Sequence, residues 1–371
     1  MPKRVLITGG AGFIGSHLAD ELLEHGYRVR ALDCLSPQVH GAARERPEYL
    51  DGDVELVVGD ARDGKAVARA LDGVDAVYHF AAAVGVGQSM YEVERYTSVN
   101  DLGTSVLLEA LIRRPVEKLV VASSMSVYGE GLGRAPDGRV RNASERTLEQ
   151  LRRGLWEVLG DDGAPLEPIA TPESKPPSLS SVYALSKYVQ ERMSLLIGRA
   201  YNIPTTALRF FNVYGPRQSL SNPYTGVLAI FAARLVNDKP PLVFEDGLQK
   251  RDFVSVHDVA RACRLVLETP GVDGGVFNVG GGRAYTVREI ADSIARALNK
   301  EIAPKIVGKY RVGDVRHCFA DIGLARARLG YRPRVELDEG VAELAEWLAG
   351  RTADDRTESA GAELAARGLT L

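Results

Sequence analysis

Hydrophobic positions in the first third of the chain follow two alternating patterns. Short runs rich in Val, Ile and Leu predict strands, and stretches with apolar residues three or four positions apart predict helices. The predicted strands cover residues 4–8, 27–33, 54–59, 76–80 and 118–122, and the predicted helices cover residues 14–23, 65–71 and 97–113. Because parallel strands need a long crossover, usually a helix, this alternation predicts an α/β fold with a doubly wound parallel sheet.

The regular pattern stops after Gly129 and returns about fifty residues later. Segments such as APDGRV, GDDGAPLEP and TPESKPP interrupt it, and a compact domain seldom leaves so long a stretch irregular without a function. We therefore expect an insert or lid over residues 130–180. The pattern then predicts a helix over 181–201, a strand over 205–210, and helices near 227–236, 257–267, 287–298 and 337–348.

Glycines fill the turn between the first strand and the first helix. Gly9, Gly12 and Gly15 lie in the run TGGAGFIG. In the Rossmann arrangement that this spacing predicts, the first glycine permits a tight turn, the second lets a pyrophosphate approach, and the third lets the helix pack on the strand. The helix N-terminus, at Phe13 and Ile14, supplies amide donors for phosphate. The sequence thus predicts a dinucleotide site.

The end of the second strand indicates which dinucleotide binds. Asp33 can accept both ribose hydroxyls, its carboxylate would repel a 2′-phosphate, and the next three residues offer no arginine. We therefore expect NAD rather than NADP. After the third strand, Asp60 and Ala61 are expected beside the adenine. Alternatively, Asp60 caps the helix that begins near Lys65.

These elements suggest how the chain is divided. We expect a dinucleotide-binding domain over residues 1–212, with the insert at 130–180. A smaller mixed α/β substrate domain is expected mainly over 213–350, with some segments returning to the first domain. Residues 351–371, rich in Ala, Glu and Arg, are expected to form a surface helix or a frayed tail.

Composition narrows the class of protein. The 371 residues carry a formal charge of −3, with 45% hydrophobic and 26% charged residues, which argues against a nucleic-acid binder with a basic surface. Cys34, Cys263 and Cys318 lie far apart, so neither a disulfide framework nor a cysteine metal site is predicted. The sequence has neither a secretory signal pattern nor an apolar run of membrane-spanning length. We expect a cytoplasmic protein that binds no membrane and no metal.

Three polar residues are candidates for catalysis. Tyr183 and Lys187 lie four residues apart in a predicted helix, hence on one face, although an exposed helix face would explain the same spacing. A tyrosine is a poor base at its usual pKa of about 10, and a neighbouring ammonium would favour the phenolate. Ser124 follows the fifth strand, at the carboxyl edge where ligands of open α/β sheets bind.

Motifs are spread over most of the chain. They are TGGAGFIG at 8–15, HFAA at 79–82, SSMSVYG at 123–129, YALSK at 183–187, RFFNVYGPRQ at 209–218 and DGLQKRDFVSVHDVA at 246–260. Together they resemble the extended short-chain dehydrogenase/reductase superfamily and, within it, the NAD-dependent nucleotide-sugar epimerases. The resemblance implies a catalytic set of Ser124, Tyr183 and Lys187. It implies cofactor contacts from Phe80, Ala81, Ala82, Asn100, Tyr183 and Lys187.

The resemblance further implies a reaction without net redox change. In a 4-epimerase, Tyr183 would take the proton of the sugar O4 while NAD⁺ takes hydride from C4, and the hydride would return to the other face of the 4-keto sugar. Sugar-nucleotide 4,6-dehydratases, the nearest alternative, carry an acid directly after the residue that corresponds to Ser124. Met125 and Ser126 supply no such acid here. A sensor or scaffold that binds NAD without turnover is the non-enzymatic alternative.

The resemblance also implies a set of substrate-binding residues. These are Ser124, Ser126, Asn212, Phe244, Arg251, Arg311, Asp314 and Cys318. The arginines suit phosphate oxygens, Asp314 would contact the nucleotide ribose, and Phe244 would border the base. Cys318 would limit the size of a sugar substituent, or it is simply a buried apolar cysteine.

The expected substrate is a nucleoside diphosphate (NDP) hexose. The insert and the segment 219–231 resemble dTDP-L-rhamnose 4-epimerases more than UDP-galactose 4-epimerases. A dTDP-deoxyhexose such as dTDP-L-rhamnose is therefore expected first, with UDP-glucose, UDP-galactose or a UDP-uronate as alternatives. The helices at 97–113 and 181–201 resemble the pair that forms a four-helix dimer interface in the superfamily, so a homodimer is expected.

Overall fold

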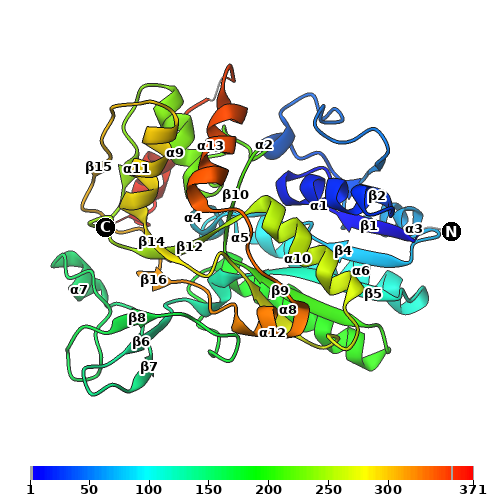
Figure 1. Ribbon diagram of the computed structural model, residues 1–371, viewed down its shortest axis with the longest axis horizontal. Coiled ribbons are helices and arrows are strands. Elements are labelled where there is room, and N and C mark those ends of the chain that lie inside the picture. The colour runs from blue at the N-terminus through cyan, green and yellow to red at the C-terminus, as the bar shows by residue number, and fades with distance from the viewer. Residues whose placement is uncertain (1–2, 352–353, 371) are drawn as a thin grey trace.

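A seven-stranded sheet forms the centre of the protein (Figure 1). The computed structural model describes residues 3–351 and 354–370, and all neighbouring strands of this sheet run parallel. In spatial order the strands are β13 (Val276–Val279), β9 (Thr205–Phe210), β5 (Lys118–Ser124), β4 (Ala76–His79), β1 (Arg4–Thr8), β2 (Arg28–Asp33) and β3 (Glu55–Val58). The order reverses between β1 and β4, so the predicted doubly wound parallel sheet is confirmed.

Fourteen α-helices are present in the described residues. They are α1 (Phe13–Glu24), α2 (Pro37–His40), α3 (Gly64–Ala70), α4 (Val86–Ser89), α5 (Val93–Tyr96), α6 (Gly103–Arg113), α7 (Leu148–Arg152), α8 (Val182–Ala200), α9 (Val227–Val236), α10 (Val256–Glu268), α11 (Val287–Ala297), α12 (Gly323–Leu329), α13 (Leu337–Leu348) and α14 (Thr357–Ala366). The sequence predicted the long ones within a few residues. It missed α2, α4, α5, α7 and α12, which are too short to show a periodic pattern.

The helices cover both faces of the sheet because strand residues alternate between the faces. Val5 and Ile7 of β1 belong to one core, which also contains apolar residues of α1, α10 and α12. Leu6, between them, belongs to a second core with apolar residues of α3 and α6. The sheet therefore lies between two hydrophobic cores, which fix the position of its carboxyl edge.

Two expected helices are present with small differences, one in its helix type and the other in its ends. The stretch expected as one helix over 97–113 begins as a π-helix, Thr97–Leu102, and continues as α6. The helix expected over 181–201 is α8, whose N-cap Ser181 accepts a hydrogen bond at 3.1 Å from the backbone N–H of Ala184.

The insert at 130–180 is more regular than its sequence suggests. It contains α7 and a three-stranded antiparallel sheet of β6 (Leu132–Arg134), β7 (Val140–Asn142) and β8 (Glu167–Ile169), at the lower left of Figure 1. Strands of three residues are too short to show alternation, which is why the sequence predicted no structure there.

A buried charge cluster joins this insert to a later segment of the chain. The fully buried guanidinium of Arg316 bonds Glu157 of the insert, and its Nη1 also bonds Glu245 at 2.9 Å and Asp246 at 2.6 Å. Arg146 bonds Glu130 at 3.2 Å and Glu245 at 2.9 Å. The insert is thereby fixed to the loop that follows β11.

The remaining strands form small sheets beside the carboxyl edge of the large one. They are β10 (Asn212–Tyr214), β12 (Lys250–Ser255), β14 (Ala284–Thr286) and β16 (His317–Cys318), together with the pair β11 (Leu242–Val243) and β15 (Lys305–Ile306). Apolar residues of α9, α11 and α13 form a separate core there. In contrast, β13, α10 and α12 return to the large sheet.

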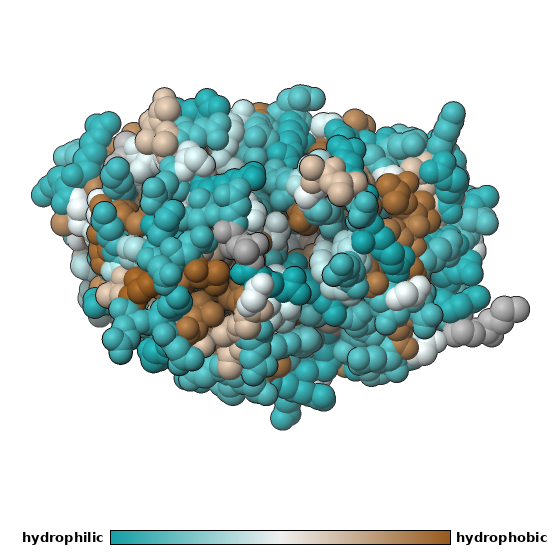
Figure 2. Space-filling view, turned by 90° about the horizontal axis from the view of Figure 1, so that it is seen from above, coloured by the Kyte–Doolittle hydropathy of each residue, from teal (hydrophilic) through white to brown (hydrophobic). Residues whose placement is uncertain are grey.

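The C-terminal tail is not frayed in the residues described. It forms α14, where Ala360 and Leu364, one turn apart, are buried. Figure 2 shows a largely hydrophilic face with separate apolar patches. No helix in the described part of the chain has both the length and the apolar character needed to cross a membrane.

An ion pair between α8 and β9 should contribute strongly to stability. The buried carboxylate of Glu191 accepts hydrogen bonds from Arg209 at 2.7 and 2.9 Å. Arg209→Met leaves that carboxylate buried without its cation, so the free energy of unfolding in urea should fall by about 3–5 kcal/mol. Arg192→Met, at an exposed position of α8, is the control and should change it by less than about 0.5 kcal/mol. Equal losses in both variants would contradict the assignment.

Candidate active site

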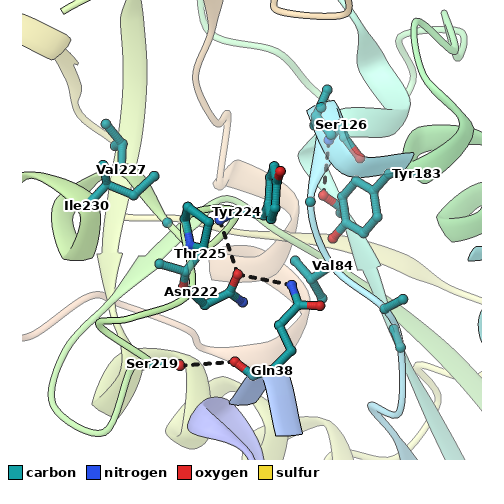
Figure 3. A pocket seen from close by; sticks show the side chains of 18 of the residues that line it. Gln38, Val84, Ser126, Tyr183, Ser219, Asn222, Tyr224, Thr225, Val227 and Ile230 are labelled. Carbon is teal, nitrogen blue, oxygen red and sulfur yellow. Dashed lines mark hydrogen bonds between the residues drawn. The ribbon is translucent and has the colours of Figure 1, made fainter. Parts of the chain in front are cut away.

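A large cavity lies where the carboxyl edge of the sheet meets the smaller sheets. Its volume is about 1230 Å³, and it is lined by the β1–α1 turn, the ends of β2, β4 and β5, the start of α8, α9 and segments 242–253 and 307–315. Ser126 and Tyr183 lie on one side in Figure 3, and Gln38, Asn222 and Tyr224 lie across from them. This cavity is the candidate site.

The predicted glycines form a close backbone turn at the cavity. Gly9 has φ +72°, and a Cβ on Gly15 would lie 2.3 Å from the carbonyl oxygen of Gly9. Gly12 is the N-cap of α1 and offers no side chain to cap it, so the first amides of the helix face the cavity uncapped. Such a cradle fits the pyrophosphate of a dinucleotide.

Asp33 stands at the cavity end of β2, as the sequence predicted. Its carboxylate accepts hydrogen bonds from the backbone N–H groups of Ala11, at 3.1 Å, and Leu35, at 2.9 Å. These two bonds orient the carboxylate while it still lines the cavity. It therefore suits recognition of a ribose.

Asp60 lines the cavity, but its carboxylate is already paired. Arg62 donates to it from the backbone N–H at 2.8 Å, from Nε at 2.9 Å and from Nη2 at 2.7 Å, and this bonding holds the pKa of Asp60 below its usual value. The alternative role of Asp60 as a helix cap is wrong, because Asp63 caps α3 through the N–H of Lys65. Ala61 lies beside Asp60 at the cavity wall.

The segment after β4 lies as expected, with one exception. Phe80, Ala81 and Ala82 line the cavity. Asn100 does not: it is completely buried, accepts a hydrogen bond from the N–H of Ala83 at 2.7 Å and donates to its carbonyl at 3.1 Å. The expectation of a direct cofactor contact from Asn100 is therefore corrected, since the amide positions the loop behind the cavity wall.

Tyr183 and Ser124 both line the cavity, and their side chains are hydrogen-bonded to each other. Burial raises the pKa of the Tyr183 phenol, and a hydrogen bond with the Ser124 side chain lowers it. Ser124 ends β5 and also accepts a hydrogen bond from the N–H of Ser126 at 3.2 Å. The N–H of Tyr183 donates to Ser89 at 3.0 Å, which fixes the start of α8.

Lys187 lies one turn further along α8, at the cavity floor. It is 3% exposed, and its ammonium donates to Gln190 at 2.7 Å. Burial lowers the pKa of Lys187 to about 7, and Glu191 raises it only in part. The effect of Lys187 on the Tyr183 phenol that the sequence leads us to expect stays a prediction. Ser124 is the group that lowers the pKa of Tyr183 here.

Residues behind the catalytic candidates were not found from the sequence. Gln190 also donates to Thr104 at 2.9 Å, and Thr104 in turn contacts His79 at 2.8 Å. Burial lowers the pKa of His79 to about 3, so the imidazole is neutral at physiological pH. Spacing in the sequence gives no signal for this hydrogen-bond network, since its residues come from three separate elements.

Most of the predicted substrate residues line the same cavity. They are Ser124, Ser126, Asn212, Phe244, Arg251, Arg311 and Asp314. The Arg311 guanidinium bonds Asp314 at 2.8 Å and lies over the Phe244 ring at 5.2 Å from its centroid. The hydroxyl of Ser126 is buried without a hydrogen-bond partner, which suits a polar group of a ligand.

Arg251 and Cys318 differ from the other predicted substrate residues in their surroundings. Arg251 lines the cavity but donates to the backbone carbonyls of Arg316, at 2.9 Å, and Lys250, at 3.0 Å, so part of its guanidinium is occupied. Cys318 is 1% exposed and lies outside the cavity wall, with its Sγ 4.0 Å from Thr171 Oγ1. Of the two roles expected for Cys318, its burial favours that of a buried apolar cysteine over contact with a sugar substituent.

An insert or lid is expected over residues 130–180, and residues 130–179 do not line the cavity. Polar side chains form a bridge elsewhere at the cavity wall. Gln38 of α2 donates to Asn222 at 3.0 Å, and Ser219 donates to the Gln38 carbonyl at 3.4 Å (Figure 3). This bridge joins the segment after Asp33 to the loop before α9. No metal-binding group of three or more His, Cys, Asp or Glu side chains occurs among the described residues.

The glycine cradle, Asp33 and the tyrosine on α8 define a dinucleotide-dependent α/β enzyme. A family model described as "NAD dependent epimerase/dehydratase family" matches residues 5–150 and 157–280. The chain belongs to this family. The expected resemblance, enzymatic class and NAD cofactor are thereby confirmed.

Individual relatives resemble the chain over nearly their whole length. It is 37% identical to the dTDP-L-rhamnose 4-epimerase of Burkholderia thailandensis, over 94% of this chain and 95% of the relative. A structure of UDP-glucose 4-epimerase from Thermotoga maritima with UDP-glucose matches with TM-score 0.76 and 31% identity, over 93% and 98% of the two chains. The UDP-glucose 4-epimerase of Thermus thermophilus with NAD matches with TM-score 0.74 and 32% identity, over 94% and 100%.

The contact between Ser124 and Tyr183 predicts a change in pH dependence. If the phenolate is the base, kcat falls as pH drops below the pKa of Tyr183. Ser124→Ala removes the bond that lowers this pKa, so the acid limb of the pH–kcat profile should move to higher pH. At neutral pH, kcat should fall by about 10²–10³ because a donor is lost.

Ser123→Ala is the matched control. The Ser123 hydroxyl donates to Glu191 at 2.7 Å rather than to Tyr183, so its removal should leave the acid limb in place. An unshifted limb in Ser124→Ala, or the same shift in both variants, would refute the role of Ser124.

Proposed function

We propose that this NAD-dependent nucleotide-sugar 4-epimerase inverts C4 of a dTDP-deoxyhexose, with dTDP-L-rhamnose as the first candidate, through a transient 4-keto sugar. The observation that carries the reaction type is the pairing of Tyr183 with Ser124 in a cavity that also contains the glycine cradle. The 37% identity to a dTDP-L-rhamnose 4-epimerase supports the substrate. UDP-glucose, UDP-galactose or a UDP-uronate is the second candidate, supported by the structural resemblance to UDP-glucose 4-epimerases.

Different residues of the chain have different roles in such a reaction. Bound NAD supplies a hydride acceptor that later acts as the donor. Tyr183 takes the proton of the sugar O4 and later returns it, while the Ser124 hydroxyl bonds the same oxygen. The Ser126 hydroxyl, which has no partner in the protein, is available to another sugar hydroxyl. Arg311, beside Phe244, suits the diphosphate.

Lys187 completes the catalytic set with Ser124 and Tyr183 in this proposal. It lies at the cavity floor one turn from Tyr183, and burial brings its pKa to about 7. Its side chain can therefore change between ammonium and neutral amine near neutral pH. The bond to Gln190 keeps it at the floor of the cavity.

A 4,6-dehydratase fits this site less well. Elimination of water across C5 and C6 of a sugar needs an acid and a base near those atoms. The two residues that follow Ser124 at the cavity wall are Met125 and Ser126, and neither ionises in the working pH range. The site therefore favours epimerisation.

The proposal includes a homodimer formed through the helices at 97–113 and α8. Three leucines on these helices support it, because they are apolar and about half exposed: Leu102 at 51%, Leu185 at 48% and Leu196 at 47%. The cytoplasmic location expected from the sequence stays a prediction.

The substrate is tested by incubating the purified protein separately with dTDP-L-rhamnose and UDP-galactose. Inversion at C4, followed by NMR of the sugar, is expected with both nucleotide sugars or one of them, and with higher kcat/KM for dTDP-L-rhamnose. Tyr183→Phe, which loses only the phenol oxygen, is the matched control and should give no inversion while keeping its NAD. No inversion of either compound by the unaltered protein would refute the proposal.

A further inference from the structure

Helix α14, expected from the sequence to be a surface helix or a frayed tail, contributes to the wall of the cavity. Its cavity-lining residues are Thr357, Glu358, Ala360, Gly361, Leu364 and Ala365. The last four recur at positions i, i+1, i+4 and i+5, so they form one face of the helix. This face is apolar and built from small side chains, with Leu364 at its centre.

Contacts at both ends fix α14 at the cavity. Before the helix, Asp355 pairs with the buried guanidinium of Arg234 at 3.2 Å, and Arg234 also reaches Glu358 at 3.3 Å. Arg234 belongs to α9, which itself lines the cavity. After the helix, the N–H of Val312 donates to the carbonyl of Leu369 at 3.0 Å.

A third group of contacts holds the outer side of the helix. The carboxylate of Glu363 accepts hydrogen bonds from Tyr91 at 3.3 Å and from Tyr224 at 3.4 Å. The guanidinium of Arg367 lies 4.5 Å from the centroid of the Tyr91 ring. The helix is therefore built into the site rather than resting loosely on it.

The neighbours of α14 indicate what this wall contacts. The backbone of Arg311 pairs with Thr370, shortly after the helix, and the Arg311 guanidinium lies over Phe244. Lys309 and Arg251 line the same cavity. Cations and an aromatic ring next to an apolar helix face suit the phosphates and the flat base of a nucleotide.

We propose that α14 forms the wall against which the nucleoside diphosphate part of the substrate lies. The C-terminal segment would then be a binding element that sets the affinity for the nucleotide, independently of the reacting groups on α8 and β5. This inference rests on the proposed function, because it assumes that the substrate is a nucleotide sugar.

Gly361 allows a direct test. A Cβ at this position would meet no atom within 4 Å, so Gly361→Leu should fold and project its side chain into the cavity. Binding of dTDP and of UDP to the full-length protein is measured by isothermal titration calorimetry. Affinity should fall by about tenfold or more in Gly361→Leu for the nucleotide that the unaltered protein binds. The NAD content of the purified variant should be unchanged.

Ala362→Leu is the matched control, because Ala362 is exposed and does not line the cavity. Its affinity should stay within about twofold of the unaltered protein. A second pair, Ala365→Leu against Ala366→Leu, repeats the comparison without replacing a glycine, because both alanines are exposed and only Ala365 lines the cavity.

The outcomes separate this inference from the proposed function. If the unaltered protein binds neither dTDP nor UDP, the proposed function fails and the wall has no nucleotide to contact. If it binds one of them and both cavity-facing variants bind it equally well, the proposed function survives and the role of α14 is refuted. Loss of NAD in the cavity-facing variants would likewise refute it, because α14 would then act on the cofactor.

Discussion

The close backbone approach in the β1–α1 turn is the constraint on which the site depends. Only a residue without Cβ fits at Gly15, where that atom would lie 2.3 Å from the Gly9 carbonyl oxygen. This approach brings the N-terminus of α1 to the carboxyl edge of the sheet, at the point where the strand order reverses. The ends of β2, β4 and β5 reach the same edge, so Asp33 and Ser124 line one cavity although they lie 91 positions apart in the sequence.

Burial determines the protonation chemistry at this edge. It raises the pKa of Tyr183 and lowers that of Lys187, so both groups shift towards their neutral forms. The hydrogen bond from Ser124 opposes the shift at Tyr183, and the Glu191 carboxylate opposes the shift at Lys187. Glu191 is in turn paired with Arg209. Lys187 is thereby linked to the ion pair that stabilises α8 on the sheet.

The sequence was sufficient for features whose signal is local. Gly9, Gly12, Gly15 and Asp33 lie at fixed distances along the chain from one strand and one helix, and the long elements around them have clear periodicity. Contacts between distant segments carry no such signal. Whether Asn100 touches the cofactor or supports Ala83 depends on a packing distance that spacing along the chain does not encode.

The same reason explains why the sequence did not predict the strands of the insert or the packing of the tail helix. Three-residue strands and a ten-residue helix gain their stability from tertiary contacts, such as those of Arg316 with Glu157 and of Arg234 with Asp355, rather than from their own propensity. Cys318 was assigned to the cavity by resemblance, and the packing around Thr171 puts it behind the wall. The tail matters most for the site, because α14 forms part of the cavity wall.

In the proposed reaction, the hydrogen at C4 of the sugar leaves and returns as hydride within the active site, and Tyr183 transfers only the O4 proton. The most direct measurement uses the accepted nucleotide sugar with deuterium at C4 and follows the label by mass spectrometry and NMR. We expect the C4-inverted product to keep its deuterium, and to gain none when the reaction is run in D₂O with unlabelled sugar. Exchange of the C4 hydrogen with solvent, or a product that has lost water, would contradict it.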